Sequence, residues 1–111
     1  MSAFRAVLIG TDGRVQDLAC DGLRMMQRAV GGYIDLLFLT GEVSGFVNEE
    51  GHGLPPNRIA GRVCARLGLR LRQPVFGPLL LVGPPSRHGD ETDCPDGVRA
   101  VAFEEARRAE I

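Results

Sequence analysis

The stretch YIDLLFLTGEVSGFVNE, residues 33–49, decides the fold that we predict for this chain. Its first part, residues 33–40, is aliphatic or Phe at five of eight positions, which is too continuously apolar for a strand with one face in water. We therefore expect a central strand that is covered on both faces. Residues 41–45 turn the chain back, and residues 45–49 are predicted to run antiparallel beside this strand as a β-hairpin.

The residues before this hairpin predict another hairpin and a short helix. Residues 6–19 contain an apolar run, an Asp-Gly turn at positions 12 and 13, and then an alternation of apolar and polar residues, which is typical of a tight hairpin. Asp21 stands where a helix N-cap is expected, and Gly31-Gly32 supplies a left-handed stop. The apolar face of the helix between them is formed by Leu23, Met26 and Val30.

The residues after the central hairpin predict a second helix. Pro55-Pro56 breaks the chain, Asn57 is expected to act as the N-cap, and residues 58–67 have a helical period that ends at Gly68. The side chains expected to face the core are Ile59, Val63 and Leu67.

Residues 74–83 predict a further buried strand, because six of the ten are aliphatic or Phe. Gly77-Pro78 interrupts this run. A proline cannot donate a hydrogen bond to the ladder, so we expect either a bulge or a sheet edge at this position.

The end of the chain predicts a loop and a last helix. Residues 84–92, rich in Pro, Gly and polar residues, are predicted to be a mobile loop. Thr92 or Asp93 is expected to cap a C-terminal helix within residues 93–111. The elements then follow the order ββαββαβα, which predicts an α+β fold: a mixed, mostly antiparallel sheet packed against helices. The 111 residues are expected to form a single compact domain over residues 1–111.

Composition and charge exclude several classes of protein. Hydrophobic residues make up 44% and charged residues 24%, which excludes disordered, collagen-like and coiled-coil chains. Thirteen basic residues, all of them Arg, against fourteen acidic ones leave a net charge of -1, which excludes a general polycation. Five Phe and one Tyr provide little surface for stacking bases. A nucleic-acid partner is therefore not expected.

The cysteines and the N-terminus indicate the compartment. No signal-like stretch and no apolar run of membrane-spanning length is present, so we expect a cytoplasmic protein with no membrane partner. Cys20, Cys64 and Cys94 are odd in number and far apart, which fits neither a disulfide framework nor a zinc half-site. We interpret them as reduced thiols and predict no metal and no cofactor.

Four segments, taken in their order and spacing, carry a family resemblance. They are Gly-Gly-Tyr-Ile at 31–34, Val-Asn-Glu-Glu-Gly at 47–51, Leu-Pro-Pro-Asn-Arg at 54–58, and Gly-Pro at 77–78 before an apolar strand that ends at Gly83. They resemble a small family of phages, mobile elements and actinobacterial genomes, a domain of unknown function (DUF3846). The resemblance implies a compact intracellular domain, often carried by phages, and implies no reaction.

Residues 48–58 and their neighbours form the candidate binding site. Carboxylates, an amide, a histidine and an arginine surround a glycine-rich turn, and the start of the next helix favours an anion. We expect Arg58 or Arg62 to hold a phosphate there. The predicted ligand-binding residues are Asn48, Glu49, Glu50, His52, Asn57, Arg58, Arg62 and Gly77. Alternatively, Asn48 and Asn57 only connect the hairpin to the helix cap, and the charged residues are solvated.

Arginines also recur every four residues along the second helix and its exit. They form one basic stripe, which could follow a phosphodiester backbone or a nucleotide. Alternatively, the stripe is a solvated helix face neutralised by acidic residues of the last helix. The arginines are Arg58, Arg62, Arg66 and Arg70, and the acidic residues are Glu104, Glu105 and Glu110.

The function that we expect from these features is the non-enzymatic binding of a small anionic ligand. By analogy, a phage protein of this kind could sequester a nucleotide signal of host immunity. One alternative is a protein-interaction or inhibitor domain that acts on a host protein through an apolar patch near Phe46, Leu54 and Phe76. A second copy of the chain is another candidate partner, since small domains with apolar strands often cover a sheet edge in this way.

A third interpretation is a small hydrolase or lyase. Glu49, Glu50 and His52 could supply a general acid and a general base. The sequence contains no nucleophile elbow, P-loop, GxGxxG turn or HExxH helix, so no named catalytic motif supports this interpretation.

Overall fold

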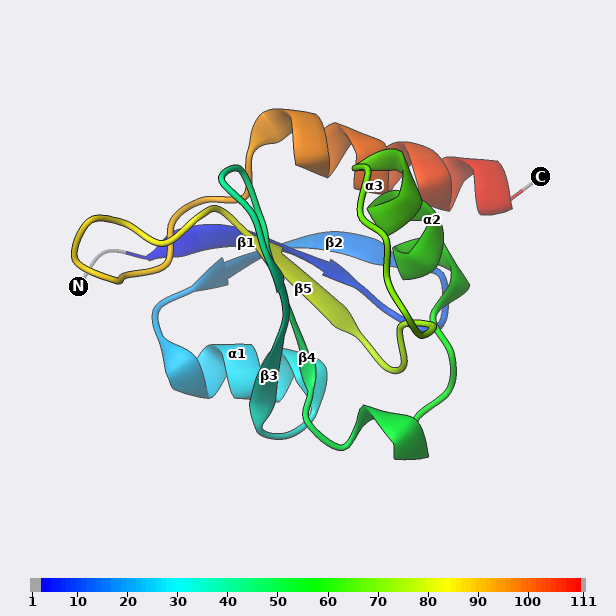
Figure 1. Cartoon of the computed structure of the whole chain (residues 1–111), viewed down its shortest axis with the longest axis horizontal. Helices are drawn as coiled ribbons and strands as arrows, with labels where there is room; N and C mark the ends of the chain where they lie inside the picture. Colours follow the sequence, from blue (N-terminus) through cyan, green and yellow to red (C-terminus); the bar gives the residue numbers. More distant parts are fainter. Residues whose placement is uncertain (1–2, 111) are drawn as a thin grey trace.

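A computed structural model of the chain describes residues 3–110 (Figure 1). Its strands are β1 (Phe4–Ile9), β2 (Val15–Cys20), β3 (Ile34–Leu39), β4 (Ser44–Asn48) and β5 (Leu79–Val82). Its helices are α1 (Leu23–Val30), α2 (Arg58–Arg66) and α3 (Asp96–Ala109), and a 3₁₀ turn, Gly51–Gly53, follows β4. The predicted order ββαββαβα is confirmed.

The five strands form one sheet in the order β2-β1-β5-β4-β3. All four pairings between neighbouring strands are antiparallel. The α+β class in one compact domain is thus confirmed, but the sheet is antiparallel throughout and not mixed. The reason is that β5 enters between the two hairpins and runs opposite to both of its neighbours.

Helices cover both faces of this sheet (Figure 1). On one face, Met26 of α1 shares a core with Leu80 of β5. On the other face, Val63 of α2 and Val98 of α3 share a core with Leu79 of β5. Because successive strand residues point to opposite faces, β5 contributes to both cores, and all four of its residues are buried.

Pro78 lies immediately before β5. Its missing N–H therefore interrupts none of the hydrogen bonds between β5 and its neighbouring strands. Just before it, an antiparallel bridge pairs Phe76 with Pro56, and Gly77 adopts a left-handed φ of +75°. The chain therefore changes its pairing partner at Gly77. Of the two predicted alternatives, the sheet edge is wrong, because β5 is the central strand.

The prediction that residues 33–40 form a central strand is wrong. β3 is an edge strand, and Leu36 and Leu39 are 48% and 55% exposed. The insertion of β5 beside β4 places the β3–β4 hairpin at the outside of the sheet. Leu37 and Phe38 do pack against the core under α2 and α3, so one face of β3 is covered.

The predicted N-cap at Asp21 is wrong. α1 begins after Gly22, whose backbone is extended, and no side chain caps this helix. The left-handed stop is confirmed at Gly31, with a φ of +83°, and Gly31 donates its N–H to the carbonyl of Gln27.

The predicted caps of the last helix are also wrong. α3 begins after Pro95 and has no side-chain cap. Thr92 donates its hydroxyl to the carbonyl of Pro84 at 2.6 Å, and Asp93 accepts the N–H of Arg5 at 2.7 Å. Both side chains therefore hold the loop and β1 together instead of capping α3. The last residue of the predicted helix, 111, lies outside the described residues.

Residues 84–92 form an excursion beyond the sheet, coloured yellow to orange in Figure 1. The Ser86 hydroxyl accepts the N–H groups of His88 and Asp90, and the N–H of Gly83 donates to the carbonyl of Thr92 at its base. The mobility of this loop stays a prediction.

A bidentate ion pair attaches α3 to the edge strand β2. Arg99 donates from Nε and Nη2 to the two carboxylate oxygens of Asp17, each at 2.7 Å. The hydrogen bond from Arg99 lowers the pKa of Asp17. The guanidinium also lies 4.5 Å from the centre of the Phe103 ring, which favours the same orientation.

The three cysteines are buried and free. Burial raises the pKa of Cys64 to about 11 and that of Cys94 to about 12. Such thiols are protonated at neutral pH and react slowly. Between residues 3 and 110, no group of three or more His, Cys, Asp or Glu side chains is placed to hold a metal ion. Within the same range, none of the helices is both long enough and apolar enough to span a bilayer.

Candidate functional site

Asn57 uses its side chain entirely on the main chain. It is 3% exposed, and its Oδ1 accepts the N–H of Ala60 at 3.0 Å, which confirms the predicted N-cap of α2. Its Nδ2 donates to the carbonyls of Ile9 and Gly77, both at 2.9 Å. The amide thus joins β1, α2 and the segment before β5. The expectation that Asn57 faces a ligand is wrong, because both of its amide hydrogens are already used.

Asn48 has a similar structural role at the other end of the segment. Its Nδ2 donates to the carbonyl of Val30 at 3.1 Å, and its Oδ1 accepts the N–H of Glu50 at 2.8 Å. These contacts fasten the end of α1 to β4 and hold the turn that follows β4. The interpretation in which Asn48 and Asn57 connect the hairpin to the helix cap holds only in part. Both amides contact the main chain, but Asn48 joins β4 to the end of α1, and Asn57 joins α2 to β1 and to Gly77 without contacting the β3–β4 hairpin.

Four other predicted residues do not come together around a ligand site. Arg58 and Arg62 lie exposed on α2, and Glu50 is exposed at the start of the 3₁₀ turn. Gly77 is buried, and a Cβ there would lie 2.6 Å from Cδ1 of Leu54. The space over Gly77 is therefore filled by the protein itself.

An open groove of about 420 Å³ lies between the β3–β4 hairpin and residues 70–76, which connect α2 to β5. Of the predicted residues, Asn48, Glu49 and His52 line it. The apolar part of its lining is formed by Leu37, Val47, Leu71, Pro74, Val75 and Phe76. The His52 ring packs at 45° to the Phe76 ring, with the ring centres 5.4 Å apart.

Six polar side chains of this groove make no hydrogen bond or ion pair with any residue between 3 and 110. They are Asp35, Glu49, His52, Arg70, Arg72 and Gln73. Both signs of charge are present, with the carboxylates on the hairpin and the guanidinium groups on the connecting segment. The groove therefore offers donors and acceptors to a bound molecule on opposite sides of an apolar surface.

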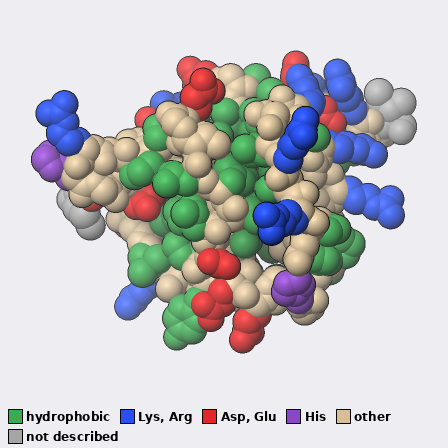
Figure 2. All heavy atoms as spheres, viewed as in Figure 1, with side chains coloured by type: hydrophobic (Ala, Val, Ile, Leu, Met, Phe, Trp, Pro, Cys, Tyr) green, Lys and Arg blue, Asp and Glu red, His purple; other side chains and the backbone are tan. Residues whose placement is uncertain are grey.

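Figure 2 shows this separation of charge on the molecular surface. Acidic side chains gather over the lower end of the β3–β4 hairpin. A histidine and basic side chains lie to the right of them, over the 3₁₀ turn and the segment between α2 and β5. A ligand with a negative group and several donor groups would match this arrangement.

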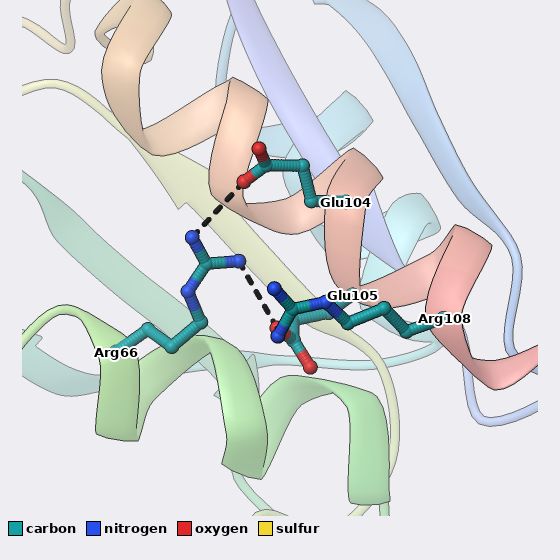
Figure 3. A network of polar contacts seen from close by, with 4 residues as sticks. All are labelled: Arg66, Glu104, Glu105 and Arg108. Carbon is teal, nitrogen blue, oxygen red and sulfur yellow. Dashed lines mark hydrogen bonds and ion pairs between the residues drawn. The ribbon is translucent and has the colours of Figure 1, made fainter.

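The arginine stripe of α2 is not one continuous anion site. Arg66 donates to Glu104 and Glu105 of α3, each at 3.0 Å, and Arg108 also contacts Glu105 (Figure 3). Glu104 and Glu105 thus neutralise Arg66, but within residues 3–110 the other three arginines of the stripe and Glu110, which follows α3, form no ion pair, so the predicted neutralisation holds for one arginine of the four. Among the four arginines of the stripe, Arg70 alone lines the groove.

The family model described as "Domain of unknown function (DUF3846)" matches residues 4–106. The chain belongs to this family. The match covers all five strands and most of α3, so the DUF3846 domain and the compact fold coincide. Neither a curated protein nor a solved structure matches the chain.

Sequence reasoning missed three side chains of the groove, Asp35, Arg72 and Gln73. A signal for part of this wall is present in the sequence Leu-Arg-Leu-Arg at residues 69–72. Both leucines pack against the core, and both arginines line the groove together with Leu71. Asp35 is the one polar residue in an apolar strand. The sequence alone could not predict which residues lie across the groove from it, because that depends on the topology of the sheet.

The predicted apolar patch is displaced. Phe46, Leu54 and Phe76 are each partly buried. Between residues 3 and 110, the large exposed hydrophobic side chains are instead Leu23, Tyr33, Leu36 and Leu39. Hydrophobic side chains are exposed over β3 and beside it in Figure 2.

Proposed function

We propose that this DUF3846 domain is a non-enzymatic module that binds a small anionic ligand of the nucleotide class in the groove between the β3–β4 hairpin and residues 70–76. The observation that supports it is the set of six polar side chains around one apolar surface that have no hydrogen-bond or ion-pair partner among residues 3–110. The volume of about 420 Å³ is that of a small-molecule site, for which roughly 300–1,000 Å³ is usual.

Each part of a nucleotide has a matching group in the groove. Arg70 and Arg72 present guanidinium forks, which suit the oxygens of a phosphate. Asp35 and Glu49, on the hairpin side, accept hydrogen bonds from hydroxyl or amino groups of a sugar or base. Phe76, beside the His52 ring, offers an apolar surface for a flat ring.

The chemistry of the side chains supports the non-catalytic form of the proposal. No hydrogen bond joins Glu49, Glu50 and His52 to each other in the described chain, and only Glu49 and His52 line the groove. The buried thiols are held protonated, so they offer no nucleophile. A module that binds a nucleotide signal without converting it would sequester that signal.

Calorimetry with defined probes tests the proposal. The probes are inorganic phosphate, the 5′-monophosphates of adenosine, guanosine, cytidine and uridine, and their 3′,5′-cyclic forms. We expect at least one nucleotide to bind, and Arg70→Ala/Arg72→Ala to weaken it by about 10-fold or more, since hydrogen bonds to charged groups each contribute about 1.5–3 kcal/mol. The matched control is Arg58→Ala/Arg62→Ala, which removes the same charge outside the groove.

Three outcomes would count against this assignment. Binding of no probe would remove the nucleotide class. Equal loss in the control variant would indicate a site at the start of α2 or a general charge effect. A new product, found by chromatography of the same mixtures, would favour a hydrolase or lyase that uses Glu49, Glu50 and His52.

A further inference from the structure

The outer edge of β3 has no strand partner within residues 3–110 and is apolar. The sheet has two edge strands, β2 and β3. β2 carries the exposed polar residues Gln16 and Asp17, and the Asp17 carboxylate is held by Arg99 of α3. β3 instead carries Leu36 and Leu39, about half of each being exposed. An edge of this kind is a template for another strand.

The backbone of the first half of β3 presents alternate residues to solvent. The carbonyl of Tyr33 accepts the N–H of Glu49, so the groups of Tyr33 point inward to β4. In an antiparallel ladder, adjacent residues alternate between facing the partner strand and facing away. With the register that pairs Ile34 with Asn48, this alternation turns the N–H and C=O groups of Ile34 and Leu36 outward.

The second half of β3 has shifted by one residue. The register changes between Leu36 and Phe38, which is the position of a β-bulge. The N–H of Thr40 donates to the carbonyl of Val43, so Thr40 points inward and Leu39 points outward. Leu36 and Leu39 therefore both offer their backbone groups to a neighbouring strand.

The side chains of these two residues also lie on one face. Leu36 pairs with Phe46 of the core beneath α1, and Leu39 pairs with Ser44 beside Val82 of the same core. Together these residues line an apolar hollow of about 160 Å³ on the α1 face. One face of the edge is thus apolar next to the two outward leucines.

We propose that two copies of the chain pair antiparallel along β3, around a two-fold axis that sets Leu36 of one copy opposite Leu39 of its partner. In this register, both outward leucines of one strand lie opposite the outward leucines of the other. The N–H and C=O groups of these leucines can then form hydrogen bonds between the two strands. The interface is the same patch on both copies, as a closed two-fold dimer requires.

The separation of like charges supports the same register. It places Asp35 opposite Thr40 of the partner and Glu42 opposite Tyr33 of the partner, so no carboxylate faces another. A register that sets Ile34 opposite Leu36 of the partner would also match outward groups, but it would place the two Asp35 carboxylates opposite each other. Like charges directly opposite each other destabilise a strand pair.

The dimer also completes the groove of the proposed function, although it does not depend on that function. Asp35 and Leu37 of β3 line the groove on the α2 and α3 face. In the proposed register, Thr40 and Phe38 of the partner stand directly beside them. The second copy would therefore close the side of the groove that is open at the sheet edge.

Sedimentation of the full chain tests the self-association. We expect a species of twice the chain mass, and Leu36→Lys should shift it to the single-chain mass, because it places a charge against an apolar side chain. The matched control is Leu23→Lys on α1, which is 56% exposed and should leave the two-chain species intact. Circular dichroism of both variants monitors the fold. A single-chain mass for the wild type, or equal dissociation by both variants, would overturn the proposal.

Cross-linking tests the register independently of mass. An equimolar mixture of Leu36→Cys and Leu39→Cys chains, mildly oxidised, should form a disulfide-linked pair, because the two positions face each other in the proposed register. Each variant oxidised alone should form several-fold less. The native cysteines are buried and should not compete. More cross-linking in either single variant than in the mixture would overturn the register.

Discussion

Replacement of Asn57 by alanine should remove three hydrogen bonds from the centre of the fold. The cap on Ala60 is lost, and the carbonyls of Ile9 and Gly77 lose their donors in a site that is 3% exposed. Loss of an N-cap costs about 1 kcal/mol, and each buried acceptor left without a partner costs about 1 kcal/mol or more. We therefore expect the free energy of unfolding to fall by about 3 kcal/mol, from a total that is roughly 5–15 kcal/mol for most domains.

Two variants separate the cap from the two donors. Asn57→Ser keeps an oxygen that can accept from Ala60, so it should recover about 1 kcal/mol of the loss. Asn57→Asp keeps the shape of the side chain and an oxygen that can cap α2. It also places a carboxylate oxygen, which can only accept, against the carbonyls of Ile9 and Gly77. Its carboxyl should have a raised pKa, so the folded state binds the extra proton and the variant becomes less stable as the pH rises from about 4 to 7.

Urea unfolding followed by circular dichroism measures these free energies. Asn48→Ala is the matched control, because that amide is only partly buried and water can replace its two contacts, at a cost of about 1 kcal/mol. A loss below about 1 kcal/mol for Asn57→Ala would refute the assigned role of Asn57. The same conclusion would follow if Asn57→Asp gained stability as the pH rose.

Three other predictions concern single groups elsewhere in the fold. Asp17→Asn should cost about 0.5–1 kcal/mol at neutral pH, because the pair is partly exposed. Since the hydrogen bond from Arg99 lowers the pKa of Asp17, this cost should be lost as the pH falls through that lowered pKa. A cost that is constant with pH in urea titrations would argue against the Arg99 contact. Cys64 and Cys94, with raised pKa values, should react with iodoacetamide at pH 8 only after unfolding, and mass spectra that show rapid labelling of the native protein would contradict their burial. Ser44 is 2% exposed, and its hydroxyl has no hydrogen-bond partner in the described chain. The substitution Ser44→Ala should therefore raise the free energy of unfolding by about 1 kcal/mol. A clear loss of stability would indicate that the hydroxyl does form a hydrogen bond.

The order of elements could be predicted from the sequence because local signals specify it. The Asp-Gly turn, the left-handed Gly31 and the Asn57 cap all act within a few residues of the chain. The place of each strand in the sheet depends on a distant event, the entry of β5 between the hairpins. Residues 34–39 are apolar except for Asp35, a composition that suits a central strand and an edge strand alike, so composition alone could not distinguish the two.

The candidate site was predicted only in part for a similar reason. Glu49 and His52 belong to the groove and were found from the dense polar segment after the hairpin. Asn57 belongs to the same dense polar segment, but its amide donates to the carbonyls of Ile9 and Gly77. These two carbonyls belong to other segments, which approach Asn57 only because of the topology of the fold. Arg70 and Arg72 face the groove because α2 returns the chain to the β3–β4 hairpin.

Chemical-shift mapping by NMR tests the central claim, that the groove and not the start of α2 binds the ligand. Isotope-labelled protein is titrated with the eight nucleotides used for calorimetry. The account predicts that at least one of them shifts the amide signals of Asp35, Glu49 and His52 together with those of residues 70–76. Shifts confined to residues 57–62, or no shifts with any of the eight, would contradict it.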